Sequence, residues 1–420
     1  MKRFSLTSIT ILLLVTVLAP AGALAKGDYD NSGFIYGEVV TESGKEYKGF
    51  LRWDDEEACW DDLFHSSKED LPYLDEIDEL DRDRDRDRGS RDKKLRIFNW
   101  SINIDSHEWQ GSDSRIFVTR FGDIERIKVT GGDDARVYMK CGEHFDVSGY
   151  ANDVGGSIYV DDETLGEIKL RWNRIGEIRF MPAPRKADAG ATRLYGKLST
   201  RRGDFAGWIQ WDKEECLSSD ELDGESEDGD VAIPMGRIKS IERYGSRGCE
   251  VQLFDGRDFR LRGTNDVNSD NRGIMIEDER FGRVTVMWDE FERLDFEKRD
   301  GSGRGYADFK GGHELKGVVT DTSGDEHRGK IVYDLDEAWS WEMLNGSVRD
   351  IEFDIPFELI KRIEPRGFDD CKIELVSGEK LRLEDSQDVS ENNDGLLVFA
   401  GKGKPDYIPW SEIESIVFDN

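Results

Sequence analysis

The segments IPFELIKRI (residues 355–363) and IPWSEIESI (residues 408–416) share an isoleucine, a proline, an aromatic residue and two further isoleucines at the same spacing. Both contain a bulky residue followed by apolar residues three and six positions later. We call this pattern the hook. It occurs six times: Phe121, Ile124, Ile127; Trp172, Ile175, Ile178; Met235, Ile238, Ile241; Trp288, Phe291, Leu294; Phe357, Ile360, Ile363; Trp410, Ile413, Ile416. This spacing predicts one short helical or 3₁₀ turn that leads into a closing strand, rather than a full helix.

The hooks belong to a longer internal repeat. Trp211 and Tyr333, Cys249 and Cys371, and Trp288 and Trp410 are all separated by 122 residues. A constant offset over such distances indicates duplication of a folded unit. We therefore predict three repeats, each with two halves that end in a hook.

The segments between the hooks have the pattern of β-strands. Residues 194–199 alternate between apolar and polar positions, and Gly203 separates them from a second alternating run. Gly207, inside that run, predicts a bend or bulge. Acidic segments follow the aromatic residue of each repeat at 54–57, 212–215 and 334–337, and we interpret them as solvated loops.

This order of elements, with a G-x-V-x-T-x-x-G start and a glycine-marked second strand, resembles Sm-like and related SH3-like small β-barrels. The resemblance implies an all-β tandem array of small barrel-like modules. Two halves that share one barrel or sandwich, giving three domains rather than six, remain an alternative. Sm-like proteins bind RNA through basic loops, and the acidic loops of this chain do not favour that activity.

The predicted domain organisation follows the repeats. A signal peptide occupies residues 1–25, and repeat 1 occupies 33–180 with a charged insertion at about 60–112 that includes DRDRDRDRGSRDKK (81–94). A linker at 181–191 precedes repeat 2 (192–298). A glycine-rich linker at 299–312 precedes repeat 3 (313–420).

The first residues indicate export. A basic start, an apolar run from Ile9 to Leu18 and the small residues around Ala25 are typical of a secretory signal peptide. We expect cleavage near Ala25 and a periplasmic or secreted mature chain. No later stretch is apolar and long enough to predict a transmembrane helix.

The charge of the chain restricts its partners. Its formal net charge is -32, which repels nucleic acid and anionic membrane surfaces. A protein or polysaccharide partner is compatible with it, and the oligomeric state stays open. A hydrophobic content of 37% is too high for a chain that is disordered throughout.

The chain has five cysteines, at positions 59, 141, 216, 249 and 371. An exported protein can keep disulfides, and an odd count leaves at least one thiol unpaired. Pairs within a repeat, Cys59 with Cys141 and Cys216 with Cys249, are conceivable, and buried free thiols are the alternative.

One loop has the spacing of a calcium ligand set. Asp266, Asn268, Asp270 and Glu277 stand at positions 1, 3, 5 and 12, as in an EF-hand loop. Position 6 is Asn271 rather than glycine, and no helices flank the loop. A turn rich in Asn and Asp is the alternative. We therefore predict no resident cofactor and keep calcium as an alternative hypothesis.

Tryptophan could bind a sugar by stacking. Trp339 and Trp341 lie on one side of an extended acidic segment, which makes them the candidate ligand-binding residues, with packing as the alternative.

The chain contains no recognisable catalytic motif. HExxH, GxSxG and phosphate-binding GKS/T patterns do not occur. We therefore predict an exported, non-catalytic binding or scaffold protein. A carbohydrate-binding protein and a calcium-stabilised surface protein are the alternatives.

Overall fold

The computed structural model describes residues 30–69, 73, 115–149 and 153–420. The predicted signal peptide and the charged run at 81–94 lie outside these residues. The described part is all-β: it consists of strands and 3₁₀ turns without an α-helix, arranged in two large antiparallel sheets. Within this part, no helical segment is both long enough and apolar enough to cross a membrane.

Repeat 1 forms a ten-stranded sheet. Its strands are β1 (Tyr36–Thr41), β2 (Glu46–Trp53), β3 (Leu63–Lys68), β4 (Arg115–Arg120), β5 (Ile124–Val129), β6 (Asp134–Met139), β7 (His144–Ser148), β8 (Ser157–Asp162), β9 (Gly166–Arg171) and β10 (Ile175–Phe180). The charged insertion was predicted to begin at about residue 60. Residues 63–68 form the regular strand β3, so the predicted start is too early.

Repeats 2 and 3 share a twenty-stranded sheet. Repeat 2 contains β11 (Leu194–Thr200), β12 (Gly203–Gln210), β13 (Glu221–Ser226), β14 (Gly229–Pro234), β15 (Ile238–Arg243), β16 (Gly248–Leu253), β17 (Asp258–Arg262), β18 (Ile274–Asp278), β19 (Gly282–Val286) and β20 (Phe291–Phe296). Repeat 3 contains β21 (Lys316–Asp321), β22 (Glu326–Val332), β23 (Met343–Val348), β24 (Ile351–Pro356), β25 (Ile360–Arg366), β26 (Asp370–Leu375), β27 (Lys380–Glu384), β28 (Leu396–Phe399), β29 (Asp406–Ile408) and β30 (Ile413–Phe418).

The two halves of each repeat exchange their first hairpins. In repeat 1, the β1–β2 hairpin pairs with β10 and β8 of the second half, whereas β6 and β7 pair with β5 and β3 of the first half. Two five-stranded units result, with strand orders β10-β1-β2-β8-β9 and β5-β6-β7-β3-β4. The pairings in repeats 2 and 3 follow the same scheme.

The units are joined edge to edge. The strands that follow the two hooks of a repeat pair with each other, as β5–β10, β15–β20 and β25–β30. A further pair, β19–β24, joins repeat 2 to repeat 3. The small closed barrels of the prediction are not confirmed, because no sheet closes on itself among the described residues.

The hooks form the cores of the units, as predicted. Five of them begin with a 3₁₀ turn: η2 (Phe121–Asp123), η3 (Trp172–Arg174), η4 (Met235–Arg237), η7 (Phe357–Leu359) and η8 (Trp410–Glu412). The sixth, at Trp288, is a hydrogen-bonded turn. All eighteen hook residues are buried, and none is more than 6% exposed.

Glycines allow adjacent strands to approach closely. Gly196 and Gly207 lie opposite each other in the β11–β12 pair. A Cβ atom on Gly207 would lie 1.8 Å from the carbonyl oxygen of Glu277 in β18. The register is regular at Gly207, so the predicted bulge is wrong, and the glycine instead makes room for the neighbouring strand.

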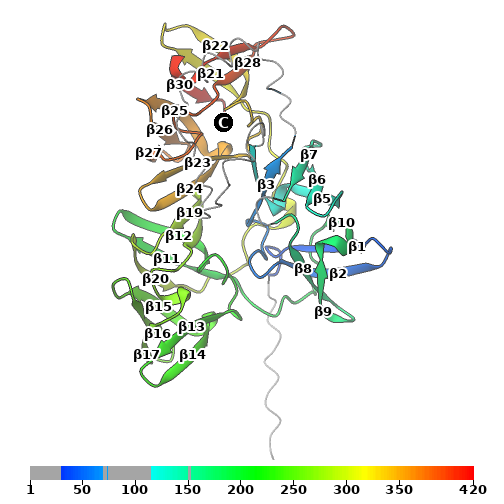
Figure 1. Ribbon diagram of the computed structural model, residues 1–420, viewed down its shortest axis with the longest axis vertical. Helices are drawn as coiled ribbons and strands as arrows, with labels where there is room; N and C mark the ends of the chain where they lie inside the picture. The colour runs from blue at the N-terminus through cyan, green and yellow to red at the C-terminus, as the bar shows by residue number, and fades with distance from the viewer. Residues whose placement is uncertain (1–29, 70–72, 74–114, 150–152) are drawn as a thin grey trace, which may run out of the picture.

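The three repeats do not form a straight line. Figure 1 shows the strands of repeat 1 beside both repeat 2 and repeat 3. Buried ion pairs connect them: Arg193 contacts Asp61 at 2.9 Å, and Lys68 contacts Asp336 at 2.8 Å. The glycine-rich linker packs on repeat 1, where the buried ring of Phe309 lies against Gly122.

Candidate functional site

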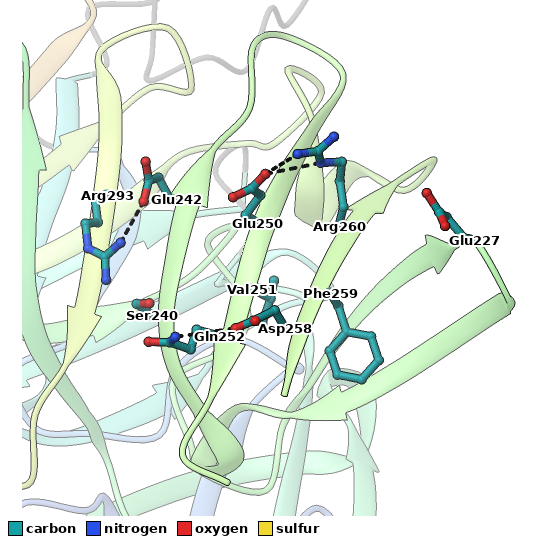
Figure 2. A pocket seen from close by; sticks show the side chains of 10 residues that line it. All are labelled: Glu227, Ser240, Glu242, Glu250, Val251, Gln252, Asp258, Phe259, Arg260 and Arg293. Atoms are coloured by element: carbon teal, nitrogen blue, oxygen red, sulfur yellow. Dashed lines mark hydrogen bonds and ion pairs between the residues drawn. The ribbon is translucent and has the colours of Figure 1, made fainter. Parts of the chain in front are cut away.

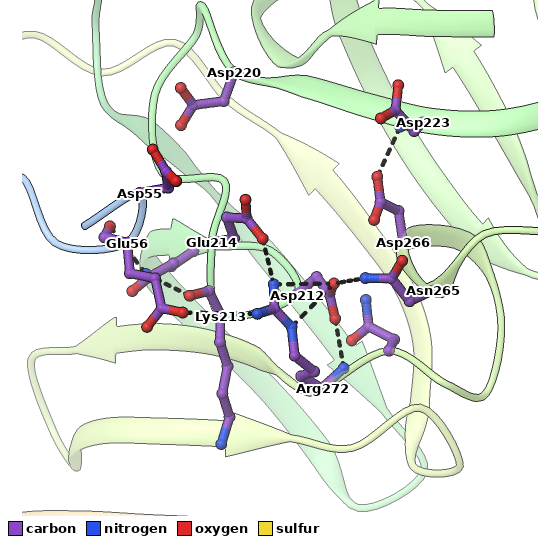
Figure 3. Close-up of polar contacts among 12 residues, drawn as sticks. Asp55, Glu56, Asp212, Lys213, Glu214, Asp220, Asp223, Asn265, Asp266 and Arg272 are labelled. Carbon is purple, nitrogen blue, oxygen red and sulfur yellow. Dashed lines mark hydrogen bonds and ion pairs between the residues drawn. The ribbon is translucent and has the colours of Figure 1, made fainter. Parts of the chain in front are cut away.

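The acidic segments after the aromatic residue are structural turns and not solvated loops. Asp54, Asp212 and Asp334 adopt positive φ angles of 45°, 52° and 47°, a conformation that Asp tolerates well. Their carboxylates accept backbone N–H groups from residues at the start of β8 or just before β18 and β28, respectively. In repeat 2, Asp212 accepts the backbone N–H of Arg272 at 2.5 Å and the amide of Asn265 (Figure 3).

A second aspartate ties the core aromatic residue to the neighbouring unit. The carbonyl oxygen of Asp266 accepts the indole N–H of Trp211 at 2.9 Å, and its carboxylate accepts the backbone N–H of Asp223 at 2.7 Å. Asp153 makes the corresponding contacts with Trp53 and His65 in repeat 1. Asp388 makes them with Tyr333 and Asn345 in repeat 3. Each of the three aspartates thus connects both units of its repeat.

A buried glutamate completes each cluster. The backbone carbonyl of Glu215 accepts the N–H of Trp211 at 2.8 Å, and Glu57 and Glu337 lie in the same place in repeats 1 and 3. Burial, together with the nearby charge of Asp266, raises the pKa of Glu215 to about 9. Burial also raises the pKa of Glu57 and Glu337 well above the usual value. With a pKa of about 9, Glu215 is protonated at neutral pH.

The predicted calcium ligands do not converge. Asp266 is 6% exposed and accepts the N–H of Asp223, whereas Glu277 lies on strand β18 and pairs with Arg283. Asn268 accepts the N–H of Asp270 at 2.6 Å, which is the Asn/Asp turn of the alternative interpretation. Across the ranges that the structure describes, no three His, Cys, Asp or Glu residues form a group that could hold a metal ion. The EF-hand spacing fails because a strand carries its twelfth position away from the loop.

The two candidate tryptophans are packing residues. Trp341 is 2% exposed, and its ring makes edge contacts with Phe117 and Phe145 of repeat 1 at centroid distances of 6.1 and 5.9 Å. Trp339 is half-buried at the edge of the same cluster. A buried indole cannot stack on a sugar, so this pair is not a carbohydrate platform.

An open groove lies on the outer face of repeat 2. It has a volume of about 380 Å³ and is lined by Glu227, Ser240, Glu242, Glu250, Val251, Gln252, Asp258, Phe259, Arg260 and Arg293 (Figure 2). Its two arginines pair with glutamates on neighbouring strands: Arg293 lies 2.7 Å from Glu242, and Arg260 donates to Glu250. Small-molecule sites are mostly apolar and enclosed, whereas this groove is open and lined mainly by polar side chains.

Comparison with known proteins does not assign the chain to a family. No protein-family model matches the chain, and no curated protein matches it. One solved structure, described as "Streptogramin B lyase structure", aligns over 71% of this chain and 94% of that chain, with 10% identity and a TM-score of 0.12. Such a TM-score does not indicate a shared fold, and the description says nothing about the chemistry of this chain.

Sequence reasoning missed the buried carboxyl clusters, although a signal existed. Asp212, Glu215 and Asp266 recur 122 positions later as Asp334, Glu337 and Asp388. A repeated acidic residue beside a repeated core aromatic residue indicates a structural contact. With 91 acidic residues in the chain, this signal is hard to separate from the background.

Proposed function

We propose that the chain is an exported, non-catalytic binding or scaffold protein built from SH3-like or Sm-like β units. The hairpin exchange is the observation that carries the proposal. Each unit uses strands from both halves of its repeat, and buried ion pairs join the repeats. Such connections favour one rigid body that presents several outer sheet faces in fixed positions.

The use of the polar residues supports a binding role over catalysis. Asp212, Asp266 and their counterparts hold backbone N–H groups, so these carboxylates serve the fold. The groove of repeat 2 offers Phe259 beside charged side chains on an open face. With a net charge of -32, a partner protein with a basic surface fits this face best.

Site-specific photo-crosslinking tests this proposal. A photoreactive phenylalanine analogue replaces Phe259 in the full chain, and the matched control carries it at Leu165, which is 66% exposed on repeat 1. We expect a crosslink from position 259 to one basic envelope protein, weakened by salt because charge pairing contributes. Equal labelling from both positions, or retention of the chain in the cytoplasm, contradicts the proposal.

Export is tested separately with a reporter. Residues 1–40 are fused to an alkaline phosphatase that is active only outside the cytoplasm, and the control fusion lacks residues 1–25. Activity is expected from the first fusion alone, with a mature chain that begins near Lys26. Equal activity from both fusions contradicts the signal peptide.

A further inference from the structure

Two cysteines from different repeats lie in one small buried cluster. Cys59 of repeat 1 and Cys216 of repeat 2 share a four-residue core with Phe34 and Ala58, and all four are at most 4% exposed. The Cys216 thiol donates to the carbonyl oxygen of Glu56 at 3.5 Å, three residues before Cys59. The cysteines are 157 positions apart in the chain, so only the packing of the repeats brings them together.

The turns that carry these cysteines have the same structure. The backbone N–H groups of Ala58 and Cys59 both bond to the carboxylate of Asp62, and those of Cys216 and Leu217 both bond to Asp220. Cys216 is therefore the counterpart of Ala58, and Cys59 that of Leu217.

Reciprocal contacts hold the two turns against each other. Gln210 donates to the carbonyl oxygen of Glu56 at 3.2 Å, and Arg52 makes the equivalent contact with Glu214 at 3.4 Å. Arg52 also pairs with Asp220 at 2.8 Å. The position of the two thiols is thus fixed by polar contacts on both sides.

The other cysteines lie elsewhere. Cys249 and Cys371 are buried at equivalent positions of strands β16 and β26, and Cys371 bonds to the carbonyl oxygen of Val389. Cys141 is half-buried in the turn after β6, beside Gly311 of the linker. The within-repeat pairs suggested by the sequence, Cys59 with Cys141 and Cys216 with Cys249, therefore join residues of different clusters.

We propose that Cys59 and Cys216 form a disulfide bond that joins repeat 1 to repeat 2. The inference rests on the proposed export, because disulfides persist in oxidising compartments. The bond would close a loop of more than 150 residues, and long loops give a large entropic stabilisation. It would reinforce an interface that already contains this small apolar cluster, polar contacts and ion pairs.

The oxidation is a pair of thiol–disulfide exchanges. One cysteine thiolate attacks a sulfur of oxidised glutathione, breaks its S–S bond and releases one glutathione thiolate. The second cysteine thiolate attacks the mixed disulfide and releases the other glutathione. The two cysteines lose two protons and two electrons in total, and one oxidised glutathione becomes two reduced molecules.

The bond is expected to form while the chain folds. Burial raises the pKa of both thiols, and for Cys216 the neighbouring Cys59 adds to the effect. The attacking species is the thiolate, so the folded, reduced protein should react slowly. Once the repeats have closed, the same burial protects the disulfide from reduction.

Peptide mapping by mass spectrometry tests the bond. The full chain is exported without reductant, denatured, alkylated and digested. A linked peptide pair is expected that contains Cys59 and Cys216, with Cys141, Cys249 and Cys371 alkylated. In parallel, the reduced protein is produced in the cytosol of an expression host and refolded in a glutathione redox buffer. This experiment tests the pairing independently of export.

Mapping both the exported and the refolded protein distinguishes a failure of the export proposal from a failure of the disulfide proposal. A linked pair in the refolded chain combined with an inactive export reporter contradicts the proposed export and leaves the pairing intact. Alkylation of both cysteines in the refolded chain, or a bond from Cys59 to Cys141, overturns the inference.

Variants give a second readout. Cys216→Ala introduces the residue that repeat 1 has at the equivalent place, so the turn should still fold. Loss of the bond should lower the melting temperature of the oxidised protein by roughly 5–10 °C and have little effect on the reduced protein. Cys141→Ser is the control and should keep the full difference between the oxidised and reduced forms. An equal effect of Cys216→Ala in both forms overturns the inference.

Discussion

Ile363 of β25 and Ile416 of β30 lie directly opposite each other in the strand pair that joins the two units of repeat 3. Each is the last residue of a hook, and each is fully buried. Ile127 faces Ile178 in repeat 1, and Ile241 faces Leu294 in repeat 2. The six hooks therefore meet in three pairs at the centres of the three repeats.

The exchange of hairpins predicts that half a repeat does not fold alone. In repeat 3, residues 313–367 contain β21 and β22, whose partners β30 and β28 lie in residues 368–420. The circular dichroism spectrum of each fragment should be that of an unfolded chain. An equimolar mixture of the two fragments should regain the spectrum of intact 313–420. Cooperative thermal unfolding of either fragment by itself would show that the hairpins are not exchanged.

Lys68 should be essential to the contact between repeats 1 and 3. Its ammonium group lies 2.8 Å from both Asp336 and Glu342, and all three side chains are 4% exposed. Lys68→Met leaves two buried carboxylates without their cation, so the free energy of unfolding should fall by about 3–5 kcal/mol.

The control for Lys68 is an exposed ion pair with the same distance between nitrogen and oxygen. Lys361 contacts Glu374 at 2.8 Å and is 57% exposed. Lys361→Met should cost at most about 1 kcal/mol in urea denaturation. Equal losses for the two variants would show that the buried pair does not hold the repeats together.

Glu215 should make stability depend on pH. Its pKa is about 9 in the folded chain because of burial, against a usual value of 4.5. Between these values the folded state binds more protons than the unfolded state, so the free energy of unfolding falls as pH rises through this window. Glu215→Gln should flatten the dependence and make the protein more stable near pH 9. Glu221→Gln, at an exposed position, should leave the slope unchanged.

Asp266 should stabilise repeat 2 without a metal ion. Asp266→Ala removes the acceptor for the N–H of Asp223 and should cost about 1–3 kcal/mol. Asp270→Ala, in the exposed part of the same loop, should cost little. A chelator should not change the melting temperature of the wild-type protein. A fall on chelation, with equal effects of the two variants, would restore the calcium hypothesis.

The burial of the hooks was predictable because the signal is local. A bulky residue with isoleucines three and six positions later predicts a turn and a strand, and residues such as Ile360 and Ile363 are buried as expected. Alternation along 194–199 identified strand β11 in the same way. Local patterns show what a segment forms and which of its faces is apolar.

The partners of the strands were not predictable. Strand β12 could pair with the next strand, β13, or with β18, and both have suitable alternation. Pairing depends on long-range packing, which a single sequence does not reveal. The choice between ligand binding and packing for Trp341 was left open for the same reason, because the surface that buries it belongs to repeat 1.

The most direct test of the account is a methyl NOE measurement on protein labelled at the isoleucine δ1 methyl groups. Residues opposite each other in antiparallel strands have Cβ atoms about 4.5–5.5 Å apart. The account predicts cross-peaks between Ile363 and Ile416 and between Ile127 and Ile178. Absence of both cross-peaks in a folded sample would show that the hooks do not meet inside the β repeats.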